Sequence, residues 1–214
     1  MNIQYDSELT MKSIFSLVIA LLLLSVPAQA DAQDLSDPET TLLTVPAVQR
    51  AITAIYKLES DGTLTQTRRG VGTMFCISDT PGDNRFSVSC HANTTFDLVE
   101  YEMMLRAEES EHRRELIESA YKSGEVELPS GSFSFYASGA LNEELGRPET
   151  LRHWMEIRVP YATSADLGVT TENAGADPWM MGEGEFSAHI MIDYRSKSWA
   201  EFAGETLTDA SARD

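Results

Sequence analysis

The sequence predicts an α+β domain in which an antiparallel sheet carries a disulfide-linked hairpin and is accompanied by one long charged helix. Three observations lead to this expectation. Short segments of alternating apolar and polar residues recur between turn residues, as is typical of half-buried strands. The two cysteines, Cys76 and Cys90, flank a turn. Residues 98–123 have the length, the terminal residues and the charge pattern of a helix.

Residues 1–30 are interpreted as a secretory signal peptide, with translation starting at Met11. Lys12 supplies the positive charge, residues 14–26 are apolar apart from two serines, and residues 28–30 have the small-x-small pattern of a cleavage site. An apolar helix of this length spans about 20 Å, less than the roughly 30 Å of a membrane interior. We therefore expect no stable membrane span after cleavage, and a periplasmic or secreted protein.

The chain is strongly acidic, with 34 Asp and Glu against 16 Lys and Arg and a formal net charge of −18. A surface of this charge repels nucleic acids and anionic lipids. We therefore expect no nucleic-acid partner.

The expected organisation is a flexible leader over residues 31–46, a single α+β domain over residues 47–205 and a frayed tail over residues 206–214. Residues 47–58 are compatible with a short helix or a first strand. The strand is favoured because Asp61 and Gly62 then form a hairpin turn into a polar second strand.

Residues 71–77 and 85–91 are expected to form the two strands of the next hairpin, because both alternate and turn residues fill positions 80–84. A turn centred there places Cys76 opposite Cys90. Facing Cα atoms in an antiparallel pair are about 4.5–5.5 Å apart, which a disulfide can span. In the oxidising compartment outside the cytoplasm we expect this bond to form, with a stabilisation of roughly 3 kcal/mol.

A catalytic thiol is the alternative for Cys90, because His91 follows it directly. Adjacent residues of a strand point to opposite faces, and the cysteine spacing is not C-x-x-C. A structural cross-link is therefore the favoured interpretation.

Residues 98–123 are expected to form the long helix, with Asp97 as N-cap, Glu100 completing a capping box and Gly124 following the last turn. Residues 106–115 are almost wholly charged, so the middle of the helix should project into solvent or break there. Three acid–base pairs four residues apart favour the helix: Glu102–Arg106, Glu109–Arg113 and Glu118–Lys122.

Three further strands are expected, at residues 132–137, 150–159 and 185–194, with a loop over residues 138–149. The connection over residues 161–184 is too long to be featureless in a compact domain. Three large side chains on it are expected to be core residues or the wall of a ligand site: Trp179, Met180 and Met181.

Common catalytic motifs are missing from the sequence. It contains no G-x-S-x-G, P-loop, dinucleotide-binding glycine motif or H-E-x-x-H. We assign no catalytic residue, and a hydrolase remains an alternative without a readable site.

Two H-x-M pairs occur on expected strands, His153 with Met155 and His189 with Met191. Residues i and i+2 of a strand share a face, so each pair presents an imidazole beside a thioether. These ligands suit Cu(I), which makes a copper site one hypothesis. The alternative is that the methionines fill space in the core.

The segments WMEIRVPYATSADLG, residues 154–168, and PWMMGEGEFSAHIMI, residues 178–192, contain an IRVP-x-AT…PW-x-M…AHIM pattern. The stretch over residues 125–193 resembles a group of uncharacterised bacterial proteins that carry signal peptides. The resemblance implies an exported bacterial protein and brings no activity, cofactor or catalytic residue.

The sequence therefore favours an exported, non-enzymatic binding or envelope-associated protein, whose ligand or envelope partner it does not identify. A periplasmic copper-binding protein and a hydrolase are the two alternatives.

Overall fold

The computed structural model describes residues 35, 38–80, 84–173, 175–194 and 196–203. The expected signal peptide and the tail over residues 206–214 lie outside the described residues. The structure divides the chain into two units at residues 33 and 34, and all described residues belong to the second.

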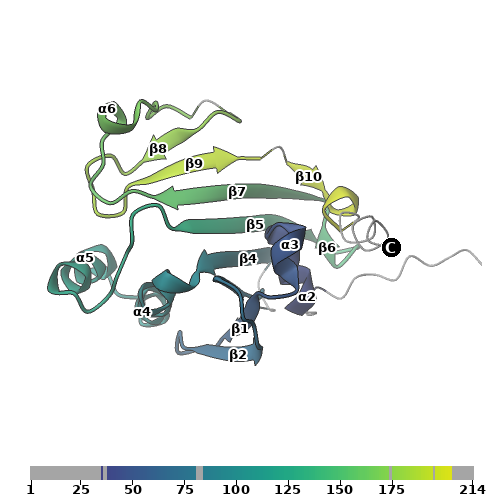
Figure 1. The fold of residues 1–214 in the computed structure, drawn as a ribbon. Helices are drawn as coiled ribbons and strands as arrows, with labels where there is room; N and C mark the ends of the chain where they lie inside the picture. The colour runs from purple at the N-terminus through teal and green to yellow at the C-terminus, as the bar shows by residue number, and fades with distance from the viewer. Residues whose placement is uncertain (1–34, 36–37, 81–83, 174, 195, 204–214) are drawn as a thin grey trace, which may run out of the picture. The chain divides into compact units, whose positions relative to one another are not determined.

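The described residues form a ten-stranded sheet with the order β2-β1-β3-β4-β5-β7-β9-β8, while β6 pairs with β5 and β10 with β7 (Figure 1). Only the β1–β3 pairing is parallel among these strands. The strands are β1 Ala54–Leu58, β2 Leu64–Arg68, β3 Met74–Ile77, β4 Arg85–Ala92, β5 Phe133–Asn142, β6 Arg147–Pro148, β7 Thr150–Arg158, β8 Trp179–Met181, β9 His189–Asp193 and β10 Lys197–Ser198.

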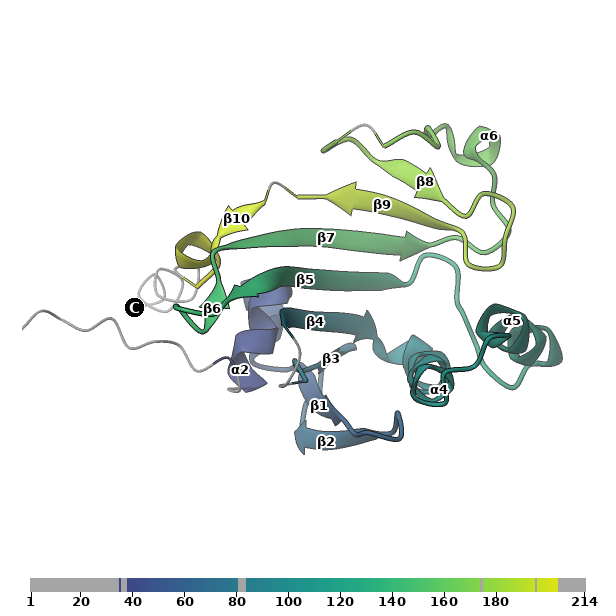
Figure 2. The ribbon, with the colours of Figure 1, turned by 180° about the vertical axis from the view of Figure 1, so that it is seen from behind.

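The helices are short and lie in two groups. Figures 1 and 2 show α2, α3 and the last described helical residues toward one end of the long strands, with α4 and α5 toward the other. The helices are α2 Pro38–Thr41, η1 Leu42–Thr44, α3 Ala47–Arg50, η2 Asn93–Thr95, α4 Phe96–Ala107, α5 Arg113–Ser123 and α6 Ser164–Leu167. Residues 199–203 are also helical.

The strands β4, β5, β7 and β9 have two faces of opposite character, which follow from the alternation in their sequences. What we call the apolar face carries Phe86, Val88, Cys90, Phe135, Ala137, Leu151, His153 and Met155. What we call the polar face carries Ser87, Ser89, His91, Ser134, Tyr136, Ser138, Arg152, Trp154, Glu156, Arg158, His189, Met191 and Asp193.

The two ends of the described chain cover the apolar face. Leu43 from η1 and Trp199 and Phe202 from the C-terminal helical residues pack on Phe86 and its neighbours. Residues 38–45, which the sequence analysis assigned to a flexible leader, are thus part of the packed domain. Helix α4 covers the other side of the sheet only near β1 and β3, where its Val99 joins a separate cluster.

The disulfide hairpin is confirmed. β3 and β4 are antiparallel neighbours, Cys76 lies opposite Cys90, and the two form a disulfide with Cα atoms 3.9 Å apart. Both sulfurs lie in an apolar cluster that contains Leu42 and Ile55. The antiparallel character of the sheet is also confirmed, apart from β1 against β3.

The expectation of one long charged helix is wrong. The segment forms α4 and α5, and the break falls in the charged run, where Glu109 has a φ of 52°. Helices in proteins are stabilised mainly by burying an apolar face, and this run has no such face. The break was the stated alternative. Gly124 ends α5 in the left-handed conformation, with φ 78°, as expected.

The start of this segment also differs from expectation. α4 begins at Phe96, so Asp97 lies inside the helix and is not its N-cap. Glu100 does not complete a capping box. Its Oε1 instead accepts a hydrogen bond of 3.1 Å from the backbone N–H of Leu64 on β2. A tertiary contact therefore replaces the expected local one.

Four expected strand boundaries are corrected, of which the first is that β3 begins at Met74 and not at residue 71. Residues 47–50 form α3, and the strand starts only at Ala54. The segment therefore contains both a short helix and a strand, which the sequence analysis treated as alternatives. β5 continues to Asn142 into the expected loop, where it pairs with β6. β9 begins at His189, since residues 182–188 are mostly turns.

Candidate functional site

A hollow of about 650 Å³ lies between α4 and the polar face. Its floor comes from three central strands and β9, and one wall comes from α4. The floor includes Ser89, His91, Tyr136, Trp154, Glu156 and His189, and the charged residues around it include Glu102, Arg106 and Arg158.

The local sequence explains why these side chains meet. Period-two alternation in β4 and β7 directs every second residue to the polar face, as with Trp154, Glu156 and Arg158. On α4, Glu102 and Arg106 are four residues apart and therefore share one side of the helix. The floor is thus set by strand pairing and the wall by helix periodicity.

Aromatic side chains from neighbouring strands form a row on the floor. The rings of Tyr136 and Trp154 are stacked, with centroids 5.0 Å apart and planes at 9°. His91 meets Tyr136 edge-on at 5.5 Å, and the Arg152 guanidinium lies 4.8 Å from the Trp154 ring centre. Because the ring faces of Tyr136 and Trp154 contact each other, we expect a ligand to meet the edges of these rings.

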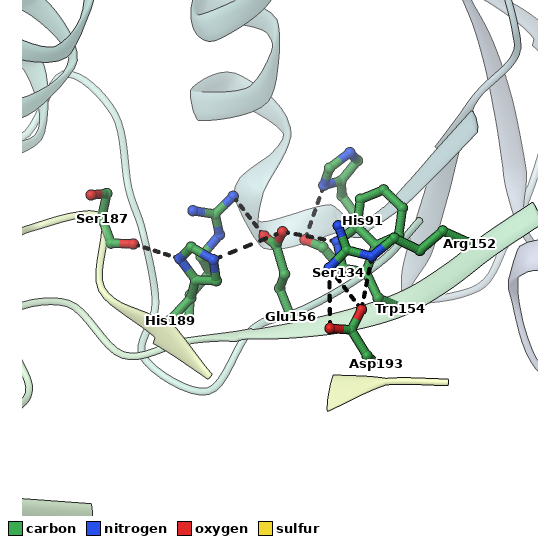
Figure 3. A network of polar contacts seen from close by, with 9 residues as sticks. His91, Ser134, Arg152, Trp154, Glu156, Ser187, His189 and Asp193 are labelled. Carbon is green, nitrogen blue, oxygen red and sulfur yellow. Dashed lines mark hydrogen bonds and ion pairs between the residues drawn. The ribbon is translucent and has the colours of Figure 1, made fainter. Parts of the chain in front are cut away.

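Glu156 is the centre of a polar network on the floor (Figure 3). Its Oε1 accepts a hydrogen bond of 3.2 Å from Trp154 Nε1, and its Oε2 lies 3.3 Å from the Arg158 guanidinium. His189 Nε2 lies 3.9 Å from Oε1, while His189 Nδ1 lies 2.8 Å from the carbonyl oxygen of Ser187. The side chains of Glu156 and Arg158 are only 12% and 17% exposed, so their charges offset one another largely away from water.

His91 is buried beneath the hollow and hydrogen-bonded on both ring nitrogens. Nδ1 lies 3.0 Å from Ser134 Oγ and Nε2 lies 2.9 Å from Ser89 Oγ. Burial, reinforced by the positive charges of Arg158 and Arg106, lowers the pKa of His91 to about 3. The imidazole is therefore neutral near pH 7.

The Ser89–His91 contact has the geometry of a nucleophile beside a base. A histidine with a pKa of about 3 is a very weak base at neutral pH, because efficient proton transfer needs a pKa near the working pH. The neutral ring instead supplies hydrogen bonding that holds Ser89 at the floor. This geometry favours binding over acyl transfer.

Glu102 and Arg106 face the hollow without partners. The sequence predicted an ion pair between them, yet neither has an ion pair or hydrogen bond with any described residue. Burial raises the pKa of the Glu102 carboxyl, although the positive charges of Arg158 and Arg106 act in the opposite direction. Of the three predicted helical pairs, Glu118–Lys122 is an ion pair, at 2.8 Å.

A second hollow, of about 630 Å³, adjoins the first. It shares Glu102, Arg106 and Arg158 with the first hollow and reaches Arg113 and Arg114 on α5. Its charged lining residues have both signs: Arg106, Arg113, Arg114 and Arg158 beside Glu102, Glu109 and Glu111.

No family model, curated protein or solved structure matches this chain. The functional evidence for the site is therefore its own geometry and chemistry.

The four residues of the H-x-M pairs do not converge. His153 and Met155 lie on the apolar face, whereas His189 and Met191 lie on the polar face. His153 Nε2 lies 3.2 Å from the backbone oxygen of Thr44, within the packed side of the sheet. The described part of the chain contains no cluster of three or more His, Cys, Asp or Glu side chains that could hold a metal ion.

The three residues expected to form a ligand wall are the strand β8, and they also divide between the faces. Met180 pairs with Ile190 and is 2% exposed, so it belongs to the core. Trp179 and Met181 pair with Met191 and His189, and so lie on the side of the polar face. The Trp179 Nε1 is buried and has no hydrogen-bond partner among the described residues.

Among the floor and wall residues named above, His189 alone is one of the site residues that the sequence predicts. Strand alternation directs His91, Trp154 and Glu156 to one side of their strands, but it does not single out which of the polar residues become enclosed. That information lies in the order β4-β5-β7-β9 and in the position of α4. Apart from the H-x-M pattern at His189, the local signal is the Glu102–Arg106 spacing, which by itself indicates a helix-stabilising pair.

Proposed function

We propose that this chain is an exported, non-enzymatic binding protein whose ligand is a small polar molecule held between α4 and the polar face. The observation that carries the proposal is a hollow with a hydrogen-bonding floor that is also lined by the half-buried Glu102 and the exposed Arg106, neither of which has an ion pair among the described residues. Clefts that combine enclosed aromatic surface with a few converging polar groups are typical ligand sites.

Export is part of the proposal and has separate support. The Cys76–Cys90 disulfide is of the kind that persists in oxidising compartments. The signal-peptide pattern of residues 1–30 agrees with it. In the described residues, no helix is long and apolar enough to cross a membrane.

The binding function is tested by thermal unfolding against individual amino acids, organic acids, nucleosides and monosaccharides. A compound that binds the native state raises the unfolding midpoint, and the rise increases with the ratio of its concentration to its dissociation constant. Ser87 is exposed at the rim, so Ser87→Phe should obstruct the hollow without disturbing the core. Gln66→Phe, at an exposed position of β2, is the matched control.

A compound that stabilises the wild type and the Gln66→Phe variant, but not the Ser87→Phe variant, is the expected result. If every stabilising compound acts equally on all three proteins, or if none stabilises the wild type, the proposal fails.

A Cu(I) site at β8 and β9 is the second candidate, in a form that differs from the paired motifs. His189 and Met191 share the polar face, and Met181 lies directly opposite His189. The 2.8 Å contact of Nδ1 with the Ser187 carbonyl oxygen favours a proton on Nδ1, which leaves Nε2 as a potential ligand. One imidazole and two thioethers are soft ligands suited to Cu(I).

Anaerobic Cu(I) titration of the protein tests this candidate. The His189→Ala and Met181→Leu variants should each lose submicromolar binding, while His153→Ala on the apolar face should retain it. Binding weaker than micromolar in the wild type, or equal loss in His153→Ala, would contradict the site.

A further inference from the structure

The unpartnered charges of the hollow narrow the class of ligand. We infer that the ligand is a small zwitterion with an ammonium group and a carboxylate, as in a free amino acid, whose ammonium binds Glu102 and whose carboxylate binds Arg106. This inference rests on the proposed binding function and deepens it.

Glu102 accounts for the ammonium group of the ligand. Its side chain is half-buried, and this partial loss of water raises the pKa of its carboxyl, although Arg158 and Arg106 act in the opposite direction. A desolvated carboxylate is stabilised by a cation that donates hydrogen bonds directly to it. An ammonium group has these properties, whereas a purely anionic ligand would add repulsion from Glu102 and Glu156.

Arg106 accounts for the carboxylate of the ligand. Arg158 already contacts Glu156 at 3.3 Å, so its charge is engaged on the floor. Arg106 lines both hollows and has no ion pair among the described residues. Its guanidinium can bind a carboxylate through two parallel hydrogen bonds. A purely cationic ligand would instead face the positive charges of Arg106 and Arg158.

The spacing of the two residues fits one compact molecule. Side chains four residues apart on a helix have Cβ atoms about 5–6 Å apart, and both of these are long. A ligand whose two charges are close together can reach both groups at once. The remainder of such a ligand would lie over the ring edges of Tyr136 and Trp154 and beside the neutral His91.

Other ligand classes leave these charges uncompensated. A neutral sugar would cover Glu102 and Arg106 without providing either counter-charge. A polyphosphate would satisfy the arginines but would be repelled by Asp79, Glu102 and Glu156 around the same hollow. The mixture of both signs is therefore what separates a zwitterion from these alternatives.

The test compares three probes by thermal unfolding and calorimetry: a mixture of the common L-amino acids, the same amino acids with acetylated amino groups, and the same amino acids as C-terminal amides. The first probe carries both charges, the second lacks the ammonium and the third lacks the carboxylate. We expect only the first to stabilise the protein, and its active component to be found by testing the amino acids singly.

Two neutral variants examine the two contacts separately. Glu102→Gln and Arg106→Gln should each weaken binding of the active amino acid about 10- to 100-fold, the usual effect of losing a charge-assisted hydrogen bond. Glu108→Gln and Arg69→Gln are matched controls at exposed positions outside both hollows, and should bind as the wild type does.

A change in which probe the variant binds distinguishes direct ligand contact from a purely structural role of Glu102. Glu102→Gln removes the repulsion of an anion, so it should bind the acetylated probe more tightly than the wild type does. An unaltered or lower affinity of this variant for the acetylated probe would overturn the assignment of the ammonium to Glu102.

The results also separate this inference from the function on which it rests. Equal binding of the acetylated or amidated probe to the wild type overturns the zwitterion class. Failure of all three probes, with a different compound bound in a Ser87→Phe-sensitive manner, overturns the class and leaves the binding function standing. Failure of every compound overturns both.

Discussion

The two faces of β4 differ in exposure and in polarity. Phe86, Val88 and Cys90 are 0–3% exposed beneath the two ends of the described chain. Of the intervening residues, Ser87 is exposed, Ser89 is half-buried and His91 is buried yet fully hydrogen-bonded. One strand therefore stabilises the fold with one set of side chains and supplies the candidate site with the other.

This difference separates two kinds of substitution. A change on the apolar face should act on the free energy of unfolding, since packing there is close and replacement leaves a cavity. A change on the polar face should act mainly on binding and on pH dependence. Substitutions on each face therefore measure how far stability and binding depend on different residues.

The largest effect is expected at Phe86, which is completely buried and meets the Trp199 ring edge-on at 5.5 Å. Phe86→Ala should lower the free energy of unfolding by about 3–5 kcal/mol, because it removes apolar contacts and leaves a cavity. Urea denaturation measures the loss. Trp154→Ala on the polar face is the comparison, and an equal loss there would show that the two faces contribute alike.

Removal of the disulfide should have the next largest effect. Cys76 and Cys90 are separated by 14 positions, and closing a loop of this size stabilises the native state by about 3 kcal/mol in the chain-entropy model. The Cys76→Ala/Cys90→Ala double variant should show this loss in urea denaturation under oxidising conditions. Under reducing conditions its difference from the wild type should shrink. A double variant within 1 kcal/mol of the oxidised wild type would contradict the prediction.

His91 should make stability depend on pH. Its pKa is about 3 in the folded protein against 6.5 for the free side chain, so the unfolded chain binds the proton more readily. The neutral form contributes fully above about pH 6.5, and its contribution is lost as the pH falls toward 3. The loss attributable to this residue should reach about 2 kcal/mol at pH 5.

Comparison of wild type with His91→Gln isolates this contribution from that of other groups. Arg158, Arg106, Glu102 and Glu156 all surround the same hollow, and Glu102, with its raised pKa, acts with the opposite sign. The difference in unfolding free energy between the two proteins should shrink from pH 7 to pH 5. The exposed His112→Gln variant should keep the wild-type dependence, and a constant difference for His91→Gln would refute the assignment.

The smallest effect is expected at the ion pair between Arg152 and Asp193 on the polar face. The guanidinium contacts both carboxylate oxygens, at 2.8 and 3.1 Å, yet the arginine side chain is 50% exposed. Water screens such pairs, so Asp193→Asn should change the free energy of unfolding by only about 0.2–1 kcal/mol. A loss above 2 kcal/mol would show that the polar face contributes substantially to stability.

The features that sequence predicts correctly here are local ones. Cys76 and Cys90 are placed opposite each other by alternation and a nearby turn, and Gly124 ends a helix for conformational reasons of its own. The features that it misses depend on distant segments. Glu100 contacts Leu64 of β2 and does not cap its own helix. A local pattern carries no record of such a partner.

The candidate site illustrates the same limit. His153 and His189 have the same H-x-M pattern, but the register of β7 against β9 directs them to opposite faces. The pairing of Glu102 with Arg106 was expected from helix spacing alone, which contains no information about the hollow beside them. Enclosure arises from strand order and helix position, so it appears only when the whole fold is assembled.

Cys90 lies between Ser89 and His91 on β4, so the disulfide is anchored at the backbone that presents two residues of the floor on the opposite face. Cross-linking restricts the motion of that backbone before any ligand arrives. The conformational entropy of the floor residues is then lost during oxidative folding. Binding of the proposed ligand would not have to order these residues again. We therefore expect reduction of the disulfide to weaken the proposed binding, although neither sulfur lines the hollow.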